Sequence, residues 1–189
     1  MRIISGKFKN KKLYFPNNLK TRPLKDSVKE NIFNILNHSN NINIEIKNSN
    51  VIDLYAGTGS FGLECLSRGT SRVFFVENDL YALKNLKKNI EDLNITHEAI
   101  IYSQDVFKFL DASVLQKKID LAFLDPPYTN KTYVKIFKIL KKKDIMNKNH
   151  IFILHREKNS TEDINQHLNI IQNKIYGRSE IFFGRFFWN

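Results

Sequence analysis

The sequence has a single cysteine, Cys65, among its 189 residues, so it can form neither an internal disulfide framework nor a zinc site built from cysteines. It also lacks long apolar runs, because the uninterrupted ones, such as residues 73–76, are four residues long. A membrane-spanning helix needs about twenty apolar residues. No apolar stretch follows the first basic residues, so no signal peptide is expected. We therefore expect a soluble cytoplasmic protein without a membrane segment.

The histidines show no spacing typical of metal ligands, and none is paired with an acid in a way that the sequence specifies. We expect them to be surface or strand residues, and we expect no metal. The five are His38, His97, His150, His155 and His167.

Acidic residues are scarce, which leaves a net charge of +11, and the excess is concentrated at one end. Residues 1–30 hold nine of the thirty basic residues and two of the nineteen acids. Such clustering is typical of a segment that binds a polyanion. Compositional drift in a lysine-rich chain is the alternative, but drift would not select one end. The candidate RNA contacts are Arg2, Lys7, Lys9, Lys11, Lys12, Arg22, Lys25 and Lys29.

From residue 51 onward, short apolar segments alternate with segments of helical length. We predict strands at 51–55, 72–77, 99–103, 119–125 and 150–155, and helices at 60–68, 80–93, 106–110 and 133–140. This alternation indicates an α/β fold with a mostly parallel sheet covered by helices on both faces. Residues 168–176 and 179–188 predict a C-terminal antiparallel hairpin, and residues 161–167 a further helix.

Before residue 51 the pattern is different. Residues 2–4 and 11–15 predict a short basic β-hairpin, and Asp26 is expected to cap a helix whose apolar positions recur at helical spacing. The asparagine-rich residues 37–50 read as a linker or a solvated loop. We therefore divide the chain into an RNA-binding extension, residues 1–40, and a catalytic domain, residues 50–189.

A glycine-rich loop follows the first core strand and precedes a helix. Gly57-x-Gly59-x-x-Gly62 matches a dinucleotide fingerprint, and Glu77 lies where a ribose-binding acid belongs, so an NAD-dependent oxidoreductase is one interpretation. Asp53 favours another, since a carboxylate at the end of this strand would oppose a pyrophosphate. It suits a ligand that carries an ammonium or sulfonium group.

Asp125-Pro126-Pro127-Tyr128 directly follows the apolar strand 119–124. The two prolines remove two amide donors, so this loop offers acceptors: the Asp125 carboxylate and the neighbouring carbonyls. Tyr128 adds a flat ring on which a base can stack. The loop therefore suits the exocyclic amine of a nucleobase, whose nitrogen must be aligned with a methyl donor.

The combination of Asp53-x-x-Ala56-Gly57-x-Gly59 with Asp125-Pro126-Pro127-Tyr128 resembles S-adenosylmethionine-dependent amino-methyltransferases of nucleic acids. The resemblance is closest to the bacterial 16S ribosomal RNA guanine-N2 methyltransferases of the D type. Residues 2–13, 22–34 and 62–69 resemble that family's pattern as well. The resemblance implies a Rossmann-like class I methyltransferase fold with a seven-stranded sheet, and S-adenosylmethionine as the cofactor.

The resemblance also implies roles for individual residues. Asp53 and the loop residues Ala56, Gly57, Thr58 and Gly59 would hold the methionine end of the cofactor. Glu77 would bind the ribose hydroxyls, Asn78 would lie beside the adenine, and Asp105 and the Val106 backbone would meet the adenine amine. Asp125, Pro126, Pro127 and Tyr128 would position the guanine N2, and Arg22 with Pro23 would close over the cofactor and contact RNA.

Simpler structural roles are open for some of these acids. Asp79 is expected to cap the helix that follows it, Glu77 could do the same, and Asp105 could be a helix N-cap as well as a ligand of adenine. Cys65 is expected to be a buried helix residue rather than a nucleophile.

The substrate class follows from size and charge. Only residues 129–149 separate the Asp125 loop from the strand at 150–155, which leaves no room for a DNA target-recognition domain. We expect the partner to be small-subunit ribosomal RNA or an assembling 30S particle, read by shape and phosphate contacts, and the protein to be a monomer. Methylation of adenine N6 is the alternative reaction, and an RNA-binding protein without activity is a third interpretation.

Overall fold

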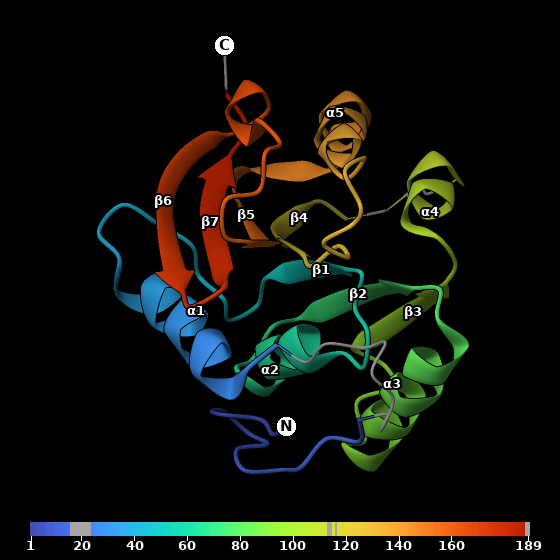
Figure 1. The fold of residues 1–189 in the computed structure, drawn as a ribbon. Helices are drawn as coiled ribbons and strands as arrows, with labels where there is room; N and C mark the ends of the chain where they lie inside the picture. Colours follow the sequence, from blue (N-terminus) through green and yellow to red (C-terminus); the bar gives the residue numbers. More distant parts are fainter. Residues whose placement is uncertain (16–23, 113–114, 116, 188–189) are drawn as a thin grey trace.

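The computed structural model describes residues 1–15, 24–112, 115 and 117–187. Its centre is a seven-stranded sheet in the order β3-β2-β1-β4-β5-β7-β6 (Figure 1). The strands are β1 (Asn50–Leu54), β2 (Arg72–Glu77), β3 (Ala99–Ser103), β4 (Ile119–Leu124), β5 (Met146–Glu157), β6 (Asn169–Tyr176) and β7 (Ser179–Arg185). The helices are α1 (Asp26–His38), α2 (Ser60–Ser67), α3 (Leu80–Asp92), α4 (Val106–Ala112), α5 (Val134–Lys143) and the short 3₁₀ helix η1 (Ile164–Gln166).

The strands pair as the sequence predicts. β1 to β5 pair with one another in parallel, and β7 runs antiparallel to both β5 and β6. Apolar runs predicted these strands well because each parallel strand is covered on both faces. β5 is longer than predicted, and only the 3₁₀ helix η1 forms where a helix was expected at 161–167. The fold class, a seven-stranded, mostly parallel sheet with a C-terminal antiparallel hairpin, is confirmed.

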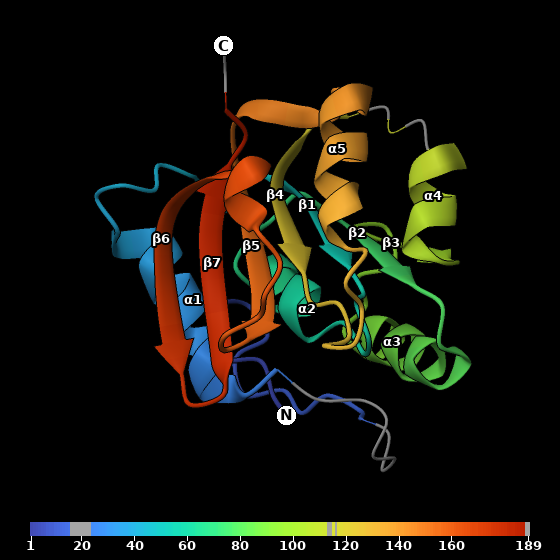
Figure 2. The same ribbon diagram turned by 45° about the horizontal axis from the view of Figure 1, so that its top comes forward.

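Helices cover the sheet on two sides (Figures 1 and 2). α1, α2 and α3 pack on one face, where the buried side chains of α1 and α2 form one hydrophobic cluster with Val51, Val73 and Phe123. α4, α5 and η1 pack on the other, against a cluster that includes Ile52 and Phe152. Adjacent strand residues therefore serve opposite faces, as the alternation of side chains along a strand requires.

The N-terminal segment pairs with itself in the predicted antiparallel sense, but without regular strands. Arg2 and Lys12 form an isolated antiparallel bridge, and the Ile3 amide donates to the Lys11 carbonyl at 3.0 Å and the Leu13 amide to the Met1 carbonyl at 3.2 Å. The predicted cap of α1 is wrong: the residue before the helix is Lys25, and Asp26 lies in the first turn without capping it by a hydrogen bond. Ile3 and Leu13 are buried in the same cluster as α1 and α2, so this segment packs on the sheet domain.

The strand order places a switch point between β1 and β4. β2 and β3 lie on one side of β1, whereas β4 and β5 lie on the other. In open parallel sheets, ligands bind at the carboxyl ends of the strands beside such a point. The residues that follow β1 and β4 are the glycine loop and the Asp125 loop, so the topology brings the two sequence motifs together.

Candidate active site

Asp53 and the glycine loop form the floor of the site. Asp53 lies near the carboxyl end of β1, with 1% of its surface exposed. Its Oδ2 accepts a hydrogen bond of 3.0 Å from the Gly62 amide in α2. Its Oδ1 is buried without a partner among the described residues. An unpaired buried acceptor is costly unless a ligand supplies a donor. This atom therefore fits the ammonium group of an amino-acid ligand.

Burial raises the pKa of Asp53 to about 8, because a charge is poorly solvated there. The hydrogen bond from the Gly62 amide opposes this rise in pKa, whereas the nearby Asp125 and Glu77 carboxylates add to it. Three acids at the ends of three strands thus make a site that carries the charges of Asp125 and Glu77 and in which a bound cation favours the ionised form of Asp53 as well. Such a site repels a pyrophosphate and attracts a cation, which argues against the NAD interpretation.

The glycine loop uses conformations that a side chain would strain. Gly57 and Gly59 have φ values of 56° and 83°. A Cβ at Gly59 would lie 2.4 Å from Leu86 Cδ1, so backbone and α3 approach closely there. A Cβ at Gly57 would meet nothing within 4 Å, which leaves open space for a ligand beside the loop.

Glu77 ties the end of β2 to the glycine loop. Its Oε2 accepts from the Gly57 amide at 2.7 Å, and its Oε1 accepts from the Asn78 and Asp79 amides at 2.8 and 2.7 Å. Asp79 in turn caps α3 by accepting from the Ala82 amide at 2.8 Å, as predicted. Three amides therefore hold the Glu77 carboxylate in place. Its ribose-binding role stays a prediction.

Asp105 and Val106 lie outside the cavity described below. Asp105 Oδ1 accepts from the Phe107 and Lys108 amides at 2.8 and 3.3 Å, which is a cap at the start of α4. Val106 is buried in the cluster between the sheet and the helices α4 and α5. Their predicted contacts with adenine stay predictions.

The Asp125 loop is held by two residues of β5. Asp125 Oδ1 lies 2.9 Å from His155 Nδ1, and the Tyr128 hydroxyl lies 3.4 Å from His155 Nε2. Arg156 donates to the carbonyls of Pro126, Pro127 and Tyr128. From the sequence, His155 was expected to be an ordinary strand residue, and no motif pointed to Arg156. His155 lies at the carboxyl end of the predicted strand 150–155, where ligand-facing residues collect, and that position was the available signal.

These elements enclose a cavity of ≈ 480 Å³. A cavity of this size can hold a nucleoside-sized ligand. The predicted cofactor residues brought together in its wall are Asp53, Ala56, Gly57, Thr58, Glu77 and Asn78, joined by the predicted catalytic residues Asp125, Pro126, Pro127 and Tyr128. Met1 and Phe15 of the N-terminal segment and Leu24 also line it, as does His155.

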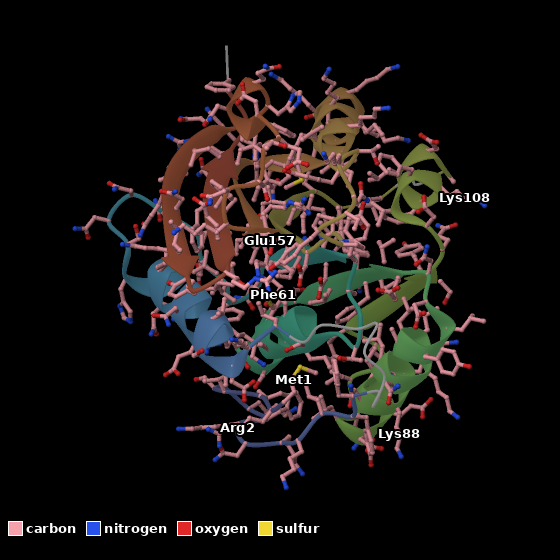
Figure 3. All side chains as sticks on the ribbon, viewed as in Figure 1. Met1, Arg2, Phe61, Lys88, Lys108 and Glu157 are labelled. Atoms are coloured by element: carbon pink, nitrogen blue, oxygen red, sulfur yellow. The ribbon has the colours of Figure 1, made fainter. Side chains whose placement is uncertain are left out.

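Five of the predicted RNA-binding lysines, Lys7, Lys9, Lys11, Lys12 and Lys25, are exposed, as is Arg2. Figure 3 shows Arg2 in the N-terminal segment and Lys88 of α3, both at the periphery of the molecule. Arg22, together with Pro23, lies outside the described residues.

The prediction that Lys29 contacts RNA is wrong, because its side chain is completely buried. Its Nζ donates to the Arg2 carbonyl at 2.7 Å and to Ser60 Oγ at 3.2 Å, and lies 3.7 Å from Glu64 Oε2. Burial lowers the pKa of this amine, against the opposing effect of Glu64 and Asp26. Lys29 therefore fastens the N-terminal segment to α2 and cannot contact RNA in this structure.

Two further observations concern ligands and membranes. Within the described ranges, no group of three or more histidine, cysteine or acidic side chains is arranged to hold a metal ion. None of the helices formed by the described residues combines the length and apolar character needed to cross a membrane.

The fold is that of methyltransferases. The solved structure of yhhF from Escherichia coli, described as a candidate methyltransferase, is similar with a TM-score of 0.82, covers 98% of this chain and 97% of that chain, and is 24% identical. An RNA methyltransferase from Salinibacter ruber, solved in complex with S-adenosyl-L-homocysteine, is similar with a TM-score of 0.63 over 86% of this chain and 92% of that chain, at 12% identity.

The family follows from sequence. The family model described as conserved hypothetical protein 95 matches residues 1–185. The ribosomal RNA small subunit methyltransferase D of Buchnera aphidicola subsp. Acyrthosiphon pisum is 30% identical over 173 residues, which is 92% of this chain and 86% of that relative. The chain belongs to this family of ribosomal RNA methyltransferases, and the resemblance inferred from its motifs is confirmed.

Proposed function

We propose that this protein transfers a methyl group from S-adenosylmethionine to the exocyclic N2 amine of a guanine in small-subunit ribosomal RNA. One observation carries the proposal: the unpartnered buried Asp53 Oδ1 and the Asp125 loop line the same cavity. The first fits the ammonium group of the methyl donor and the second fits an amine that accepts the methyl group. When bound, S-adenosylmethionine supplies an electrophilic methyl group on a sulfonium.

The chain's own residues would bind and orient the two reactants. Asp53 would accept from the ammonium group, and Glu77, which lines the same cavity, would accept from the ribose hydroxyls. Asp125 and the Pro126 carbonyl would accept the two N–H bonds of the guanine amine, so that the nitrogen lone pair points at the methyl carbon. The proton lost from the amine after transfer would pass to the Asp125 carboxylate. Alignment and charge placement of this kind account for most of such a rate enhancement.

Recognition of RNA would come from the exposed lysines of residues 1–15. This segment carries Lys7, Lys9, Lys11 and Lys12 at the surface, while its residues Met1 and Phe15 line the cavity. Phosphate contacts made by these lysines would therefore bring a nucleotide to the Asp125 loop. The same acceptors suit either amine, so the choice of guanine N2 over adenine N6 rests on the resemblance of the sequence motifs to the guanine-N2 methyltransferases.

Mass spectrometry of nucleosides from small-subunit RNA, free or in the particle, tests the reaction after incubation with the protein and S-adenosylmethionine. We expect N2-methylguanosine to form, and the Asp125→Ala variant to lower its single-turnover rate by about 10²-fold or more. N6-methyladenosine alone, or full activity of Asp125→Ala, would contradict the proposal.

Replacement of Lys7, Lys9, Lys11 and Lys12 by Gln tests the RNA contacts. The slope of log affinity against log salt should flatten by roughly 0.7–0.9 for each phosphate that the variant no longer neutralises. In the matched control, four exposed lysines that do not line the cavity are replaced by Gln, so that the loss of charge is the same. They are Lys117, Lys141, Lys142 and Lys148. Equal slopes for the two variants would exclude a specific role of the N-terminal lysines.

A further inference from the structure

β5 meets the Asp125 loop at the carboxyl edge of the sheet. β4 and β5 pair in parallel up to Leu124 and Leu154, so Asp125 and His155 are the next residues along the two strands. Each lies two positions after a residue of the cluster on the cavity face, Phe123 or Ile153, so its side chain belongs to that same face of the sheet. Arg156 continues the alternation of Phe152 and Leu154, which belong to the opposite face. Consecutive residues of β5 therefore reach the loop from its two sides.

On the cavity side, His155 contacts both functional side chains of the loop. With 5% of its side chain exposed, its Nδ1 lies 2.9 Å from Asp125 Oδ1. Its ring packs edge-on against Tyr128, with ring centroids 6.0 Å apart and an interplanar angle of 82°. The Nδ1 atom is buried and forms no well-aligned hydrogen bond with a described residue. Such contacts in a site without its substrate often tighten only in the reacting complex.

On the other side, Arg156 holds the backbone of the loop. Only 2% of its side chain is exposed, and its two terminal nitrogens donate to three successive carbonyls, of Pro126, Pro127 and Tyr128, at 3.3, 3.2 and 3.1 Å. Its guanidinium lies 4.4 Å from the ring centroid of Tyr133, and its Nη2 lies 3.8 Å from Glu162 Oε2.

The sequence of the loop explains why such outside donors are needed. Neither proline has an N–H, so the loop has few amides of its own: the Asn130 amide reaches the Pro127 carbonyl at 2.8 Å, and Arg156 supplies the further donors. Several carbonyls that point in similar directions also repel one another unless a cation lies among them. Arg presents five donors in a fixed planar fork, which suits three carbonyls better than the single ammonium of Lys.

We propose that His155 and Arg156 are positioning residues for methyl transfer: His155 orients the Asp125 carboxylate and the Tyr128 ring, and Arg156 fixes the carbonyls of the loop. This assignment rests on the proposed function, because it takes the Asp125 loop as the group that receives the target amine. Both residues act through the loop rather than on the methyl donor. Their removal should therefore lower the transfer rate while leaving the affinity for S-adenosylmethionine nearly unchanged.

A double-mutant cycle tests His155. His155→Phe keeps an aromatic ring beside Tyr128 but removes both nitrogens, and should lower the single-turnover rate about 10-fold or more. His155→Gln retains an amide donor for Asp125 and should recover part of the loss. In the Asp125→Ala background, His155→Phe should have almost no further effect. His97→Phe, at an exposed position, is the matched control. Equal losses from His155→Phe in both backgrounds would overturn the proposal.

Arg156→Lys tests the other side of the loop, with Arg185→Lys on β7 as the control at an exposed position. Hydrogen exchange of the Asn130 amide, which donates to the Pro127 carbonyl at 2.8 Å, reports loop order without any need for activity. We expect faster exchange there and slower methyl transfer, at unchanged affinity for S-adenosylmethionine measured by calorimetry. Unchanged exchange and rate would refute the role of Arg156. If the parent protein methylates no small-subunit RNA, the proposed function fails, whereas the exchange result still decides whether Arg156 holds the loop.

Discussion

The charge of Asp53 should make both stability and ligand binding depend on pH. Its pKa is about 8 in the folded protein, where it is buried, and its ordinary value is 3.8. An acid whose pKa is raised on folding binds more protons in the folded state, so its contribution to stability is lost as the pH rises through the folded pKa. At about 1.36 kcal/mol per pKa unit, the free energy of unfolding should fall by roughly 4 kcal/mol at most between pH 5 and pH 9 on account of this group.

The Asp53→Asn variant isolates that contribution. Asn can still accept from the Gly62 amide but has no charge to bury, so its stability should fall less than that of the parent over this pH range. Urea unfolding at pH 5, 7 and 9 measures the difference, and Asp92→Asn at the exposed end of α3 is the control for loss of an acid. Parallel stability curves for the parent and Asp53→Asn would refute the reasoning.

The same group should release a proton when a cationic ligand binds. At pH 7 a carboxyl group with a pKa of about 8 is roughly nine-tenths protonated. The ammonium group of S-adenosylmethionine favours the ionised form, so its affinity should rise from pH 6 to pH 7.5, below the range in which the amino group itself loses its proton. Calorimetry at pH 7 in buffers of different ionisation enthalpy should detect the release of close to one proton in the parent and none from this site in Asp53→Asn.

Three other substitutions have definite expected outcomes. Glu77→Ala removes the acceptor of the Gly57 amide and should weaken S-adenosylmethionine binding by about 1–3 kcal/mol in calorimetry. Gly62→Ala should lower stability by roughly 1–3 kcal/mol in urea unfolding, because a Cβ would lie 2.3 Å from the Phe75 ring. Lys29→Met leaves the Arg2 carbonyl and Ser60 Oγ without their donor, while Glu64 keeps Arg68 at 2.8 Å, and should cost about 1–3 kcal/mol of stability with the salt dependence of RNA binding unchanged.

The sequence predicted the strands and the site motifs because both depend on local patterns. Each of the five apolar segments predicted as a strand between residues 51 and 155 forms one, and the loops after β1 and β4 meet because parallel strands end at one edge. The N-terminal hairpin pairs through one bridge and a few backbone hydrogen bonds, while Ile3 and Leu13 pack on α1 and α2, so regular strands do not form there. Short polar segments contain too little pattern to tell these cases apart.

The burial of Lys29 and the position of His155 beside the Asp125 loop both had signals in the sequence. Lys29 lies on the helix face that also carries Val28, Ile32 and Phe33, so its helical position already predicted burial. His155 ends its predicted strand at the same edge as the motifs that were singled out. For Lys29 the residue type was given more weight than the position, whereas His155 is the strand residue that was predicted, with contacts that its position alone indicated. The carbonyl contacts of Arg156 could not be predicted, since they depend on the course of the chain after Asp125.

The buried contacts of Lys29 bear on how recognition and chemistry are connected. Its Nζ joins the Arg2 carbonyl in the N-terminal segment to Ser60 at the start of α2, directly after the glycine loop. Met1 of the same segment lines the cavity. The exposed lysines and part of the cavity wall therefore belong to the same packed segment. For this reason, division of the chain into residues 1–40 and 50–189 is a proposal about which surfaces contact RNA, and the two parts share one hydrophobic cluster.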